Sequence, residues 1–136
     1  MYQFIFYEKP ACSGNSRQKE ILKSYGIEII VKDLLATKWT FESLASYFEG
    51  LKTTEIFNIF APQIKNGLID ITTISKDDAI KLMIENPILI KRPLIDINGT
   101  KICGFNIEKI NKKLDINISF DKKVDTCLSS NKCTNV

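Results

Sequence analysis

A single cysteine stands where a short apolar run meets the start of a helical pattern. The run Tyr2–Tyr7 ends in Glu8-Lys9-Pro10-Ala11, and Cys12 comes next. The first N–H groups of a helix have no partner inside it, and the peptide dipoles leave partial positive charge there. A thiolate is stabilised at such a place, so the pKa of a cysteine can fall from about 8.5 to below neutrality. Cys12 is therefore the candidate nucleophile, and we expect its sulfur to be presented to solvent in ionised form.

The residues after Cys12 supply further groups to such a site. Arg17 follows in the predicted helix and would add a cation near the sulfur. The alternative is that Cys12 is a small residue packed at a strand end, since free cysteines are among the most buried residues; Arg17 could equally be solvated. The chain contains no histidine, so activation of the thiol must come from the helix dipole, arginine or lysine. We expect the four residues between Cys12 and Arg17 to bind the substrate, namely Ser13, Gly14, Asn15 and Ser16.

Composition and charge are those of an ordinary globular chain. Its 136 residues suit one domain, with 44% hydrophobic and 26% charged residues. The net charge is +3 and the nineteen lysines and arginines are scattered, which argues against direct binding to nucleic acid. No stretch approaches 18 consecutive apolar residues and no leader-like segment opens the chain, so we expect a cytoplasmic protein with no membrane partner.

The other three cysteines are Cys103, Cys127 and Cys133. In the cytoplasm all four would be reduced by default, and any disulfide would be catalytic or sensory. A four-thiolate zinc site is conceivable, but no CxxC spacing exists, so we expect no metal. Cys127 and Cys133 fall in a polar stretch, residues 115–136, that we expect to be a mobile tail. They could reach Cys12 and resolve a covalent intermediate, or they could be incidental.

Patterning divides the rest of the chain into three parts. Residues 15–25 form a helical stripe, and the β-branched run Ile27–Val31 predicts a second buried strand, parallel to the first. A helical insertion at about residues 34–87 follows, because no strand pattern occurs there. Within it Thr40 can cap a helix with Phe41 and Leu44 on its apolar side, Thr53 or Thr54 can cap a short piece, and Ser75 begins a capping box. Residues 64–73 are predicted to be loop.

The third part is a hairpin and a closing helix. The segments 94–97 and 101–103 flank Asn98-Gly99, which suits a type I′ turn. Pro93 opens the first hairpin strand, where proline is tolerated and a cis bond could be fixed. Asn106 then caps a helix that ends near Leu114. The order is βαβ, helical insertion, ββα, in one domain spanning residues 1–114.

This order of elements resembles the α/β thioredoxin-like fold, with a mixed four-stranded sheet. Lys9-Pro10-Ala11-Cys12 with Ser16-Arg17, and the segment Asn86–Ile95 (NPILIKRPLI), are similar to the arsenate reductase and Spx-like family. Within that family, the stretches FYEKPACSGNSRQK, DLLATKWT, FNIFAPQIK and GFNIEKI are most similar to the nitrogenase-associated subgroup. The resemblance implies a nucleophilic Cys12, Arg92 holding an oxyanion, and Pro93 in cis beside the thiol.

Three departures from the family pattern bear on function. Four residues separate Cys12 from Arg17, one more than in arsenate reductases. Those enzymes also use a second and a third arginine, and the corresponding places here, around residues 55–57 and at Gly104, hold none. Losing such contacts, worth roughly 1.5–3 kcal/mol each, would weaken arsenate binding by about two orders of magnitude or more. Asn15 stands where Spx regulators carry the second cysteine of a CxxC, so that switch is excluded.

Two functions follow from these observations. The first is a thiol oxidoreductase of the arsenate reductase type, in which the Cys12 thiolate attacks an oxyanion or a glutathione-type disulfide while Arg17 and Arg92 stabilise negative charge. Glutathione, glutaredoxin or a tail cysteine would then resolve the intermediate, with no bound cofactor. The second is a non-catalytic binding or regulatory module of the same fold, Spx-like or docked on a larger partner such as a nitrogenase-related complex.

Overall fold

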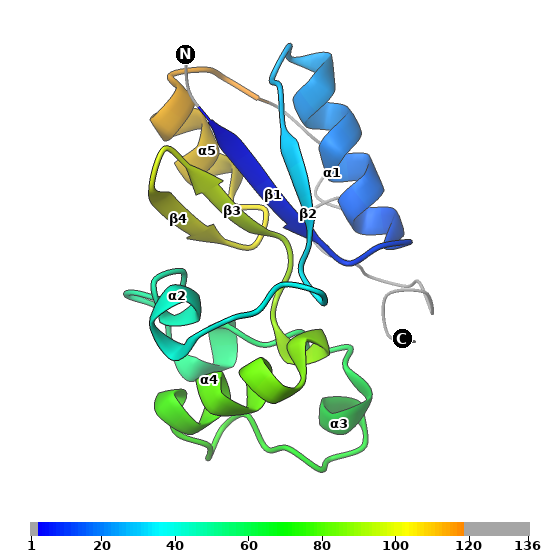
Figure 1. The fold of residues 1–136 in the computed structure, drawn as a ribbon, viewed down its shortest axis with the longest axis vertical. Coiled ribbons are helices and arrows are strands. Elements are labelled where there is room, and N and C mark those ends of the chain that lie inside the picture. Colours follow the sequence, from blue (N-terminus) through cyan, green and yellow to red (C-terminus); the bar gives the residue numbers. More distant parts are fainter. Residues whose placement is uncertain (1–2, 119–136) are drawn as a thin grey trace.

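The computed structural model of the protein describes residues 3–118. Four strands form the predicted mixed sheet, and their order in it is β2-β1-β3-β4. The central strand β1 pairs parallel with β2 and antiparallel with β3, and β3 pairs antiparallel with β4. Figure 1 shows α1 and α5 beside the sheet and the helical insertion below it. The strands are β1 (Phe4–Glu8), β2 (Ile30–Asp33), β3 (Leu94–Ile97) and β4 (Thr100–Cys103), and the flanking helices are α1 (Ser13–Ser24) and α5 (Ile107–Leu114).

Alternation along the strands divides the core into two clusters. In β1, Phe4 and Phe6 pack in one cluster with residues of α1 and α5, whereas Tyr7 packs against the cluster formed by the insertion. Successive residues of a strand point to opposite faces of the sheet, which explains this division. Helices α1 and α5 therefore cover one face together, and the insertion packs on Tyr7 and Leu94.

The insertion lies between β2 and β3, where the sequence predicts it. Thr40 caps α2, and its hydroxyl oxygen accepts a hydrogen bond from the Ser43 N–H at 3.1 Å. Ser75 caps α4 in the same way, accepting from the Asp78 N–H at 3.1 Å. These caps confirm two predicted helix starts. The elements of the insertion are α2 (Phe41–Ala45), η1 (Thr53–Glu55), α3 (Pro62–Lys65), α4 (Lys76–Glu85) and η2 (Pro87–Leu89).

The structure corrects three local predictions. The second strand is β2, later than the predicted run, and its four residues are exposed, because β2 is an edge strand with a neighbour on one side only. Phe41 is 37% exposed, since α2 ends at Ala45 and only Leu44 of this helix is buried. Part of the segment predicted to be loop forms α3, which Pro62 begins by supplying a helical φ angle at the first position.

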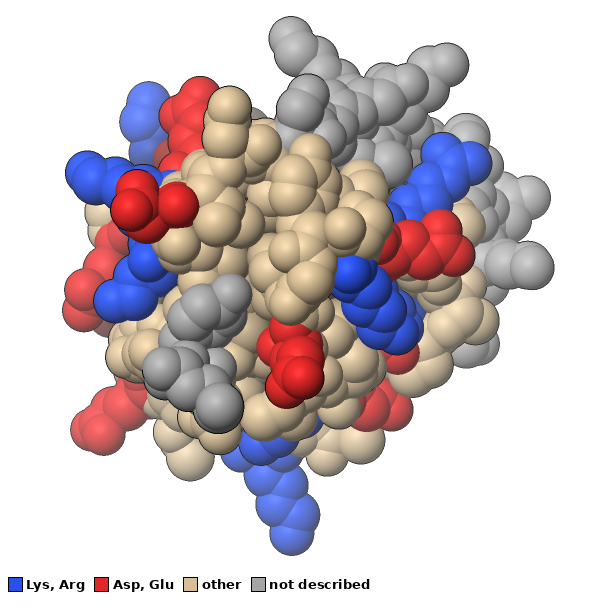
Figure 2. Space-filling view, turned by 90° about the horizontal axis from the view of Figure 1, so that it is seen from above, with Lys and Arg blue, Asp and Glu red and all other residues tan. Residues whose placement is uncertain are grey.

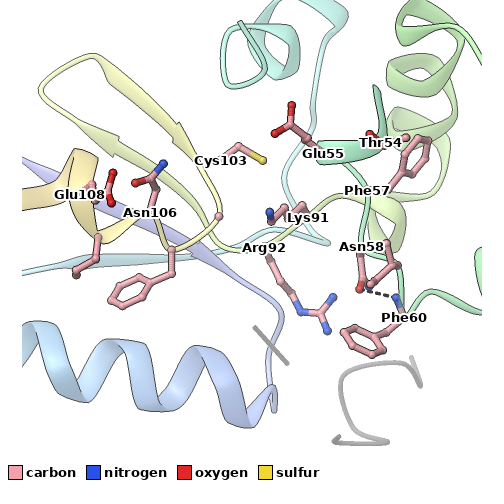
Figure 3. Close-up of a pocket in the computed structure, with 14 residues that line it drawn as sticks. Thr54, Glu55, Phe57, Asn58, Phe60, Lys91, Arg92, Cys103, Asn106 and Glu108 are labelled. Carbon is pink, nitrogen blue, oxygen red and sulfur yellow. Dashed lines mark hydrogen bonds between the residues drawn. The ribbon is translucent and has the colours of Figure 1, made fainter. Parts of the chain in front are cut away.

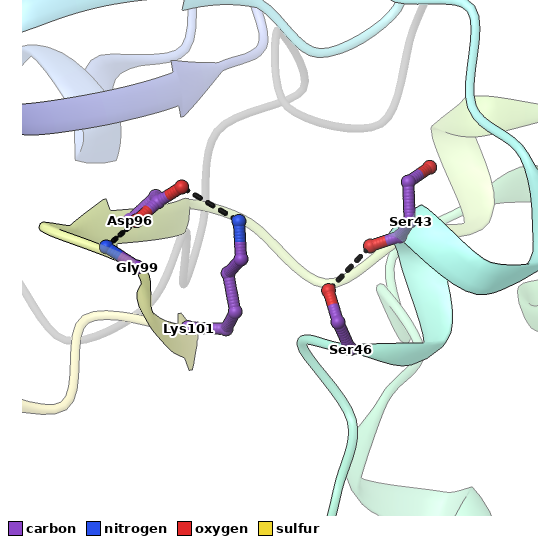
Figure 4. A network of polar contacts seen from close by, with 5 residues as sticks. All are labelled: Ser43, Ser46, Asp96, Gly99 and Lys101. Atoms are coloured by element: carbon purple, nitrogen blue, oxygen red, sulfur yellow. Dashed lines mark hydrogen bonds and ion pairs between the residues drawn. The ribbon is translucent and has the colours of Figure 1, made fainter.

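The hairpin turn has the predicted geometry. Asn98 and Gly99 have φ angles of 50° and 91°, as a type I′ turn requires. The Asp96 carboxylate accepts a hydrogen bond from the Gly99 N–H at 2.7 Å and pairs with the Lys101 ammonium at 2.6 Å (Figure 4). The same ammonium lies 5.1 Å from the centre of the Tyr47 ring, so this ion pair also joins the hairpin to the insertion.

The described chain continues past the predicted end of the domain. Asn106 caps α5 as predicted, accepting a hydrogen bond from the Lys109 N–H at 3.2 Å. The Asn111 side chain then bonds both backbone groups of Ile118, which is buried beside α5. Residues 116–118 therefore pack on the domain. The remainder of the predicted tail, with Cys127 and Cys133, lies outside the described residues.

Charged side chains are spread over the visible surface without a single-sign patch. Figure 2 looks onto the end of the molecule at the top of Figure 1, where basic and acidic side chains alternate around an uncharged central area. This distribution agrees with the scattered lysines and arginines of the sequence. Within residues 3–118 no helix has the length and apolar character needed to span a bilayer.

The two apolar residues of α2 provide a test of the packing. Leu44 is fully buried, so Leu44→Ala should lower the free energy of unfolding by about 2–5 kcal/mol. Phe41→Ala in the same helix should cost less than about 1 kcal/mol, because Phe41 is exposed. Urea unfolding followed by the fluorescence of Trp39 measures both. Equal losses of stability in the two variants would contradict this packing.

Candidate active site

Cys12 is the N-cap residue of α1. Its N–H donates to the Lys9 carbonyl oxygen at 3.1 Å, which closes the turn after β1. The first bond within the helix runs from the Ser16 N–H to the Cys12 carbonyl oxygen at 3.0 Å. The N–H groups of Ser13, Gly14 and Asn15 therefore precede the hydrogen-bond ladder and lie at the positive end of a 12-residue helix. The position is the one predicted for a stabilised thiolate.

The sulfur of Cys12 is not presented to solvent in this structure. Cys12 is 1% exposed and is disulfide-bonded. The expected exposure is therefore wrong for this form. A disulfide sulfur carries no charge, so burying it does not remove an ion from water. Cys103 is a free cysteine. The candidate resolving residues Cys127 and Cys133 lie outside the described part of the chain.

Asn15 holds the loop that carries Cys12. Its side-chain oxygen accepts a hydrogen bond from the Lys9 N–H at 3.1 Å, and its amide donates to Gln18 Oε1 at 2.9 Å. Both Asn15 and Gln18 are buried. The loop includes Ala11 at φ 66°, a left-handed conformation that needs such support. The Asn15 side chain is used within the loop, which leaves only its backbone N–H for the predicted role in substrate binding.

Two buried cations lie at the same end of the sheet. Antiparallel pairing sets Tyr7 opposite Leu94, so the residues that follow β1 and those that precede β3 are neighbours. Arg92 is 9% exposed, and burial lowers its pKa to about 10, which leaves it protonated at neutral pH. Lys9 is 5% exposed, and burial together with the nearby Arg92 charge lowers the pKa of its ammonium. The Arg92–Pro93 peptide bond is cis, as the family resemblance implies.

Lys9 is the residue of this site that the sequence does not reveal. A lysine next to proline in a loop is ordinarily a solvated residue, and only the pairing of β1 with β3 shows that it is buried beside Arg92. Arg17, which the sequence suggested as a cation near the sulfur, is instead exposed on α1. No hydrogen bond or ion pair of its side chain is seen within residues 3–118. Ser13 and Ser16 are also exposed, and Gly14 is buried.

A cavity of about 720 Å³ opens beside Arg92. Its walls come from three segments: η1 and the chain after it, Lys91 with Arg92, and the connection from β4 to α5 (Figure 3). Phe57, Phe60 and Phe105 supply apolar surface. The cavity includes the places around Glu55 and at Gly104 where the resemblance to arsenate reductases would require arginine. The charged and thiol residues of the lining are Glu55, Lys91, Arg92, Cys103 and Glu108.

Gly104 limits which side chains can line this cavity, and Cys103 does not offer it a thiolate. Gly104 has φ 81°, and a Cβ atom added there would lie 3.0 Å from Cε of Lys91. A larger residue is therefore disfavoured at Gly104 both by its backbone and by the lysine that crosses it. Burial raises the pKa of the Cys103 thiol to about 12, so that thiol remains protonated at neutral pH. Among the described residues, no three His, Cys, Asp or Glu side chains gather as a metal site would need.

Known proteins share this fold over most of the chain. Residues 7–113 match the model of the ArsC family. An uncharacterized 15.7 kDa protein in the draG 3′ region of Rhodospirillum rubrum is 32% identical over 129 residues, 95% of this chain and 90% of that protein. The regulatory protein MgsR of Bacillus subtilis is 30% identical over 123 residues, 86% of this chain and 97% of MgsR. The crystal structure of a possible arsenate reductase from Streptococcus mutans has a TM-score of 0.68 at 26% identity, covering 82% of this chain and 99% of that one.

The hydrogen bonds of Asn15 can be tested by removing them. Asn15→Ala leaves the buried Lys9 N–H donor and the Gln18 Oε1 acceptor without this partner, so the free energy of unfolding should fall by about 1–3 kcal/mol. Ser16→Ala is the control, because Ser16 is exposed and its backbone bond to Cys12 is retained; its effect should stay within about 0.5 kcal/mol. Urea unfolding of both variants decides whether Asn15 holds the loop or is dispensable.

Proposed function

Because the chain belongs to the ArsC family, we propose that it is a cysteine-based thiol oxidoreductase in which Cys12 is the nucleophile. The observation that carries the proposal is the position of Cys12. This residue lies at the amino end of α1 and at the end of the sheet where Arg92 is buried. Unbonded backbone donors and a fixed guanidinium favour the charged form of a sulfur. The disulfide at Cys12 also supports a redox role, since such bonds form at reactive thiols.

The proposed reaction is thiol–disulfide exchange. The Cys12 thiolate attacks one sulfur of a disulfide; a new bond to Cys12 forms as the substrate bond breaks, and the departing thiolate takes a proton from solvent. A second thiol then attacks the mixed disulfide and releases reduced Cys12. Arg92 and the N–H groups of Ser13 and Gly14 would stabilise the negative charge in both steps, and Pro93 would shape the substrate contact beside them.

Reduction of an oxyanion such as arsenate is the related activity. The thiolate would displace hydroxide from arsenic(V), and attack of glutathione on that adduct would give arsenic(III) and a Cys12–glutathione disulfide. The cavity offers Glu55 and Gly104 in place of further cations, so we propose that arsenate is at best a poor substrate. Resolution would come from glutathione, from glutaredoxin, or from Cys127 or Cys133 of this chain.

A second candidate is a non-catalytic regulatory module. The 30% identity to the regulatory protein MgsR favours it, because that identity extends over 86% of this chain. In this case Cys12 would be structural or would sense oxidants, and the protein would dock on a larger partner, in an Spx-like or nitrogenase-associated role. The acidity of Cys12 discriminates between the two candidates, since a catalytic thiolate must exist at neutral pH.

The first test is the pH dependence of Cys12 alkylation. In reduced protein with the other cysteines replaced by serine, iodoacetamide labelling should persist below pH 7 and fall away only below about pH 6. Arg92→Gln should move this transition upward by about one pH unit or more, because a cation that favours the thiolate is lost. A transition near pH 8.5 in the parent protein would favour the regulatory module.

Cys103 supplies the matched control for that experiment. In a variant that retains Cys103 and replaces the other cysteines, labelling at pH 7 should be negligible, because burial raises the pKa of this thiol to about 12. Ready labelling of Cys103 under these conditions would show that the structure opens during the assay. The Cys12 transition could then not be attributed to the folded site.

The second test concerns the substrate. NADPH oxidation coupled through glutathione and glutathione reductase, with glutaredoxin added only for arsenate, should respond strongly to 2-hydroxyethyl disulfide and weakly to arsenate. Cys12→Ser should abolish both responses. Arsenate turnover no faster than in this variant would remove arsenate as a substrate while leaving disulfide exchange in place. Absence of both activities in the parent protein would remove the enzymatic proposal.

A further inference from the structure

The outer strand β2 has an open side. Within residues 3–118 its neighbour in the sheet is β1, on one side only (Figure 1). Ile30 and Val31 of this strand are large and apolar, yet they are 44% and 43% exposed. Edge strands of natural proteins are usually protected from pairing with a further strand by proline, a bulge or charged side chains. In β2 the charged residues stand at one end, as Lys32 and Asp33, so the apolar part of the edge is unprotected.

The backbone of β2 turns alternate residues toward β1 and toward the open side. The N–H of Leu34, directly after the strand, donates to the Glu8 carbonyl oxygen at 2.8 Å and so points to β1. Successive residues direct their N–H and C=O groups to opposite sides of a strand. Asp33 and Val31 therefore point to the open side, as does Ile29 where the strand is extended by one residue. Because the Asp33 carbonyl oxygen is used in the following turn, Val31 and Ile29 offer groups to a further strand.

Residues 28–32 (EIIVK) are complementary to themselves in an antiparallel pair of two copies. Residues that lie opposite each other must both point their backbone groups at the partner strand, or both point them away. One register that satisfies this rule sets Ile29 opposite Val31. It also sets Ile30 opposite its own copy and Glu28 opposite Lys32. In the two neighbouring registers Ile29 or Val31 lies opposite itself, and Ile30 then faces a charged residue, so the first register is favoured.

We propose that two copies of this chain pair through β2, antiparallel, about a two-fold axis at Ile30. The two four-stranded sheets then continue as one sheet. Backbone hydrogen bonds between Ile29 and Val31, contact between the two Ile30 side chains and two pairs of opposite charge hold the copies together. The paired segment is short, so the dimer is weak. Because Asp33, the partner of Glu8 at the end of β1 that leads to the Cys12 loop, lies away from the axis, both sites stay open.

The first test measures association directly. Sedimentation velocity in reducing buffer, from about 10 µM to about 1 mM protein, follows the dimer without cysteine-linked species, and we expect a shift from monomer to dimer over this range. Val31→Pro should abolish the shift, because proline removes an N–H that points to the open side and its ring obstructs the partner strand. The bonds between β1 and β2 do not use that N–H, so circular dichroism should show this variant folded.

The second test concerns charge and register. Glu28→Lys or Lys32→Glu alone sets like charges opposite each other and should weaken association by about tenfold. An equimolar mixture of the two variants should restore it, because opposite charges then face each other at both places. The contact of the Lys32 ammonium with the Tyr7 ring, 5.9 Å from its centre, is not restored by mixing, so recovery reports the interface alone. Lys81→Glu, an equal change of net charge on α4, should leave association unchanged.

A cross-link at the axis completes the test. In a chain whose native cysteines are serine, Ile30→Cys should form an intermolecular disulfide on mild oxidation, because this position faces its own copy. Val31→Cys should form far less, since it faces residue 29. A parent protein that stays monomeric at about 1 mM, as it would if a different occupant covered β2, would overturn the proposal. So would association that persists in Val31→Pro, or a mixture of the folded charge variants that associates no better than each alone.

Discussion

The antiparallel pairing of β1 with β3 determines where every group of the site lies. The partners Tyr7 and Leu94 bring together two segments that are about eighty residues apart in the chain. One is the loop from Lys9 to Cys12, and the other is the cis peptide Arg92–Pro93. Neither segment makes a site by itself. The thiol, the helix end and the buried guanidinium become neighbours because a central strand with parallel and antiparallel neighbours ends there.

Two buried cations lie close together at this end of the sheet. Lys9 and Arg92 are both buried, and the charge of Arg92 adds to the effect of burial in lowering the pKa of Lys9. Two like charges in a poorly solvated place repel each other, and gaining an anion there relieves the repulsion. The open N–H groups of α1 act in the same direction. The same surroundings support the proposed ionisation of Cys12 in the reduced protein.

Local signals in the sequence predict most of the fold. Caps at Thr40, Ser75 and Asn106 and the turn at Asn98-Gly99 depend on side chains within a few residues, and the structure confirms them. What the sequence cannot give depends on contacts between distant segments. Exposure of β2 follows from its place at the edge of the sheet, the closeness of Lys9 to Arg92 follows from the pairing of β1 with β3, and the cavity needs three separate segments.

The two halves of the site come from different parts of the chain, and this separation explains how one fold can serve different chemistries. The thiol and its helix end belong to β1 and α1, whereas the cavity is built by the insertion and by the β4–α5 connection. A change at Glu55 or Gly104 alters the charge and shape of the cavity without touching the hydrogen bonds that position Cys12. Both a possible arsenate reductase and a regulatory protein share the fold. The cavity wall, more than the cysteine loop, is therefore the part of this scaffold that can change in charge and shape while the hydrogen bonds around Cys12 are kept.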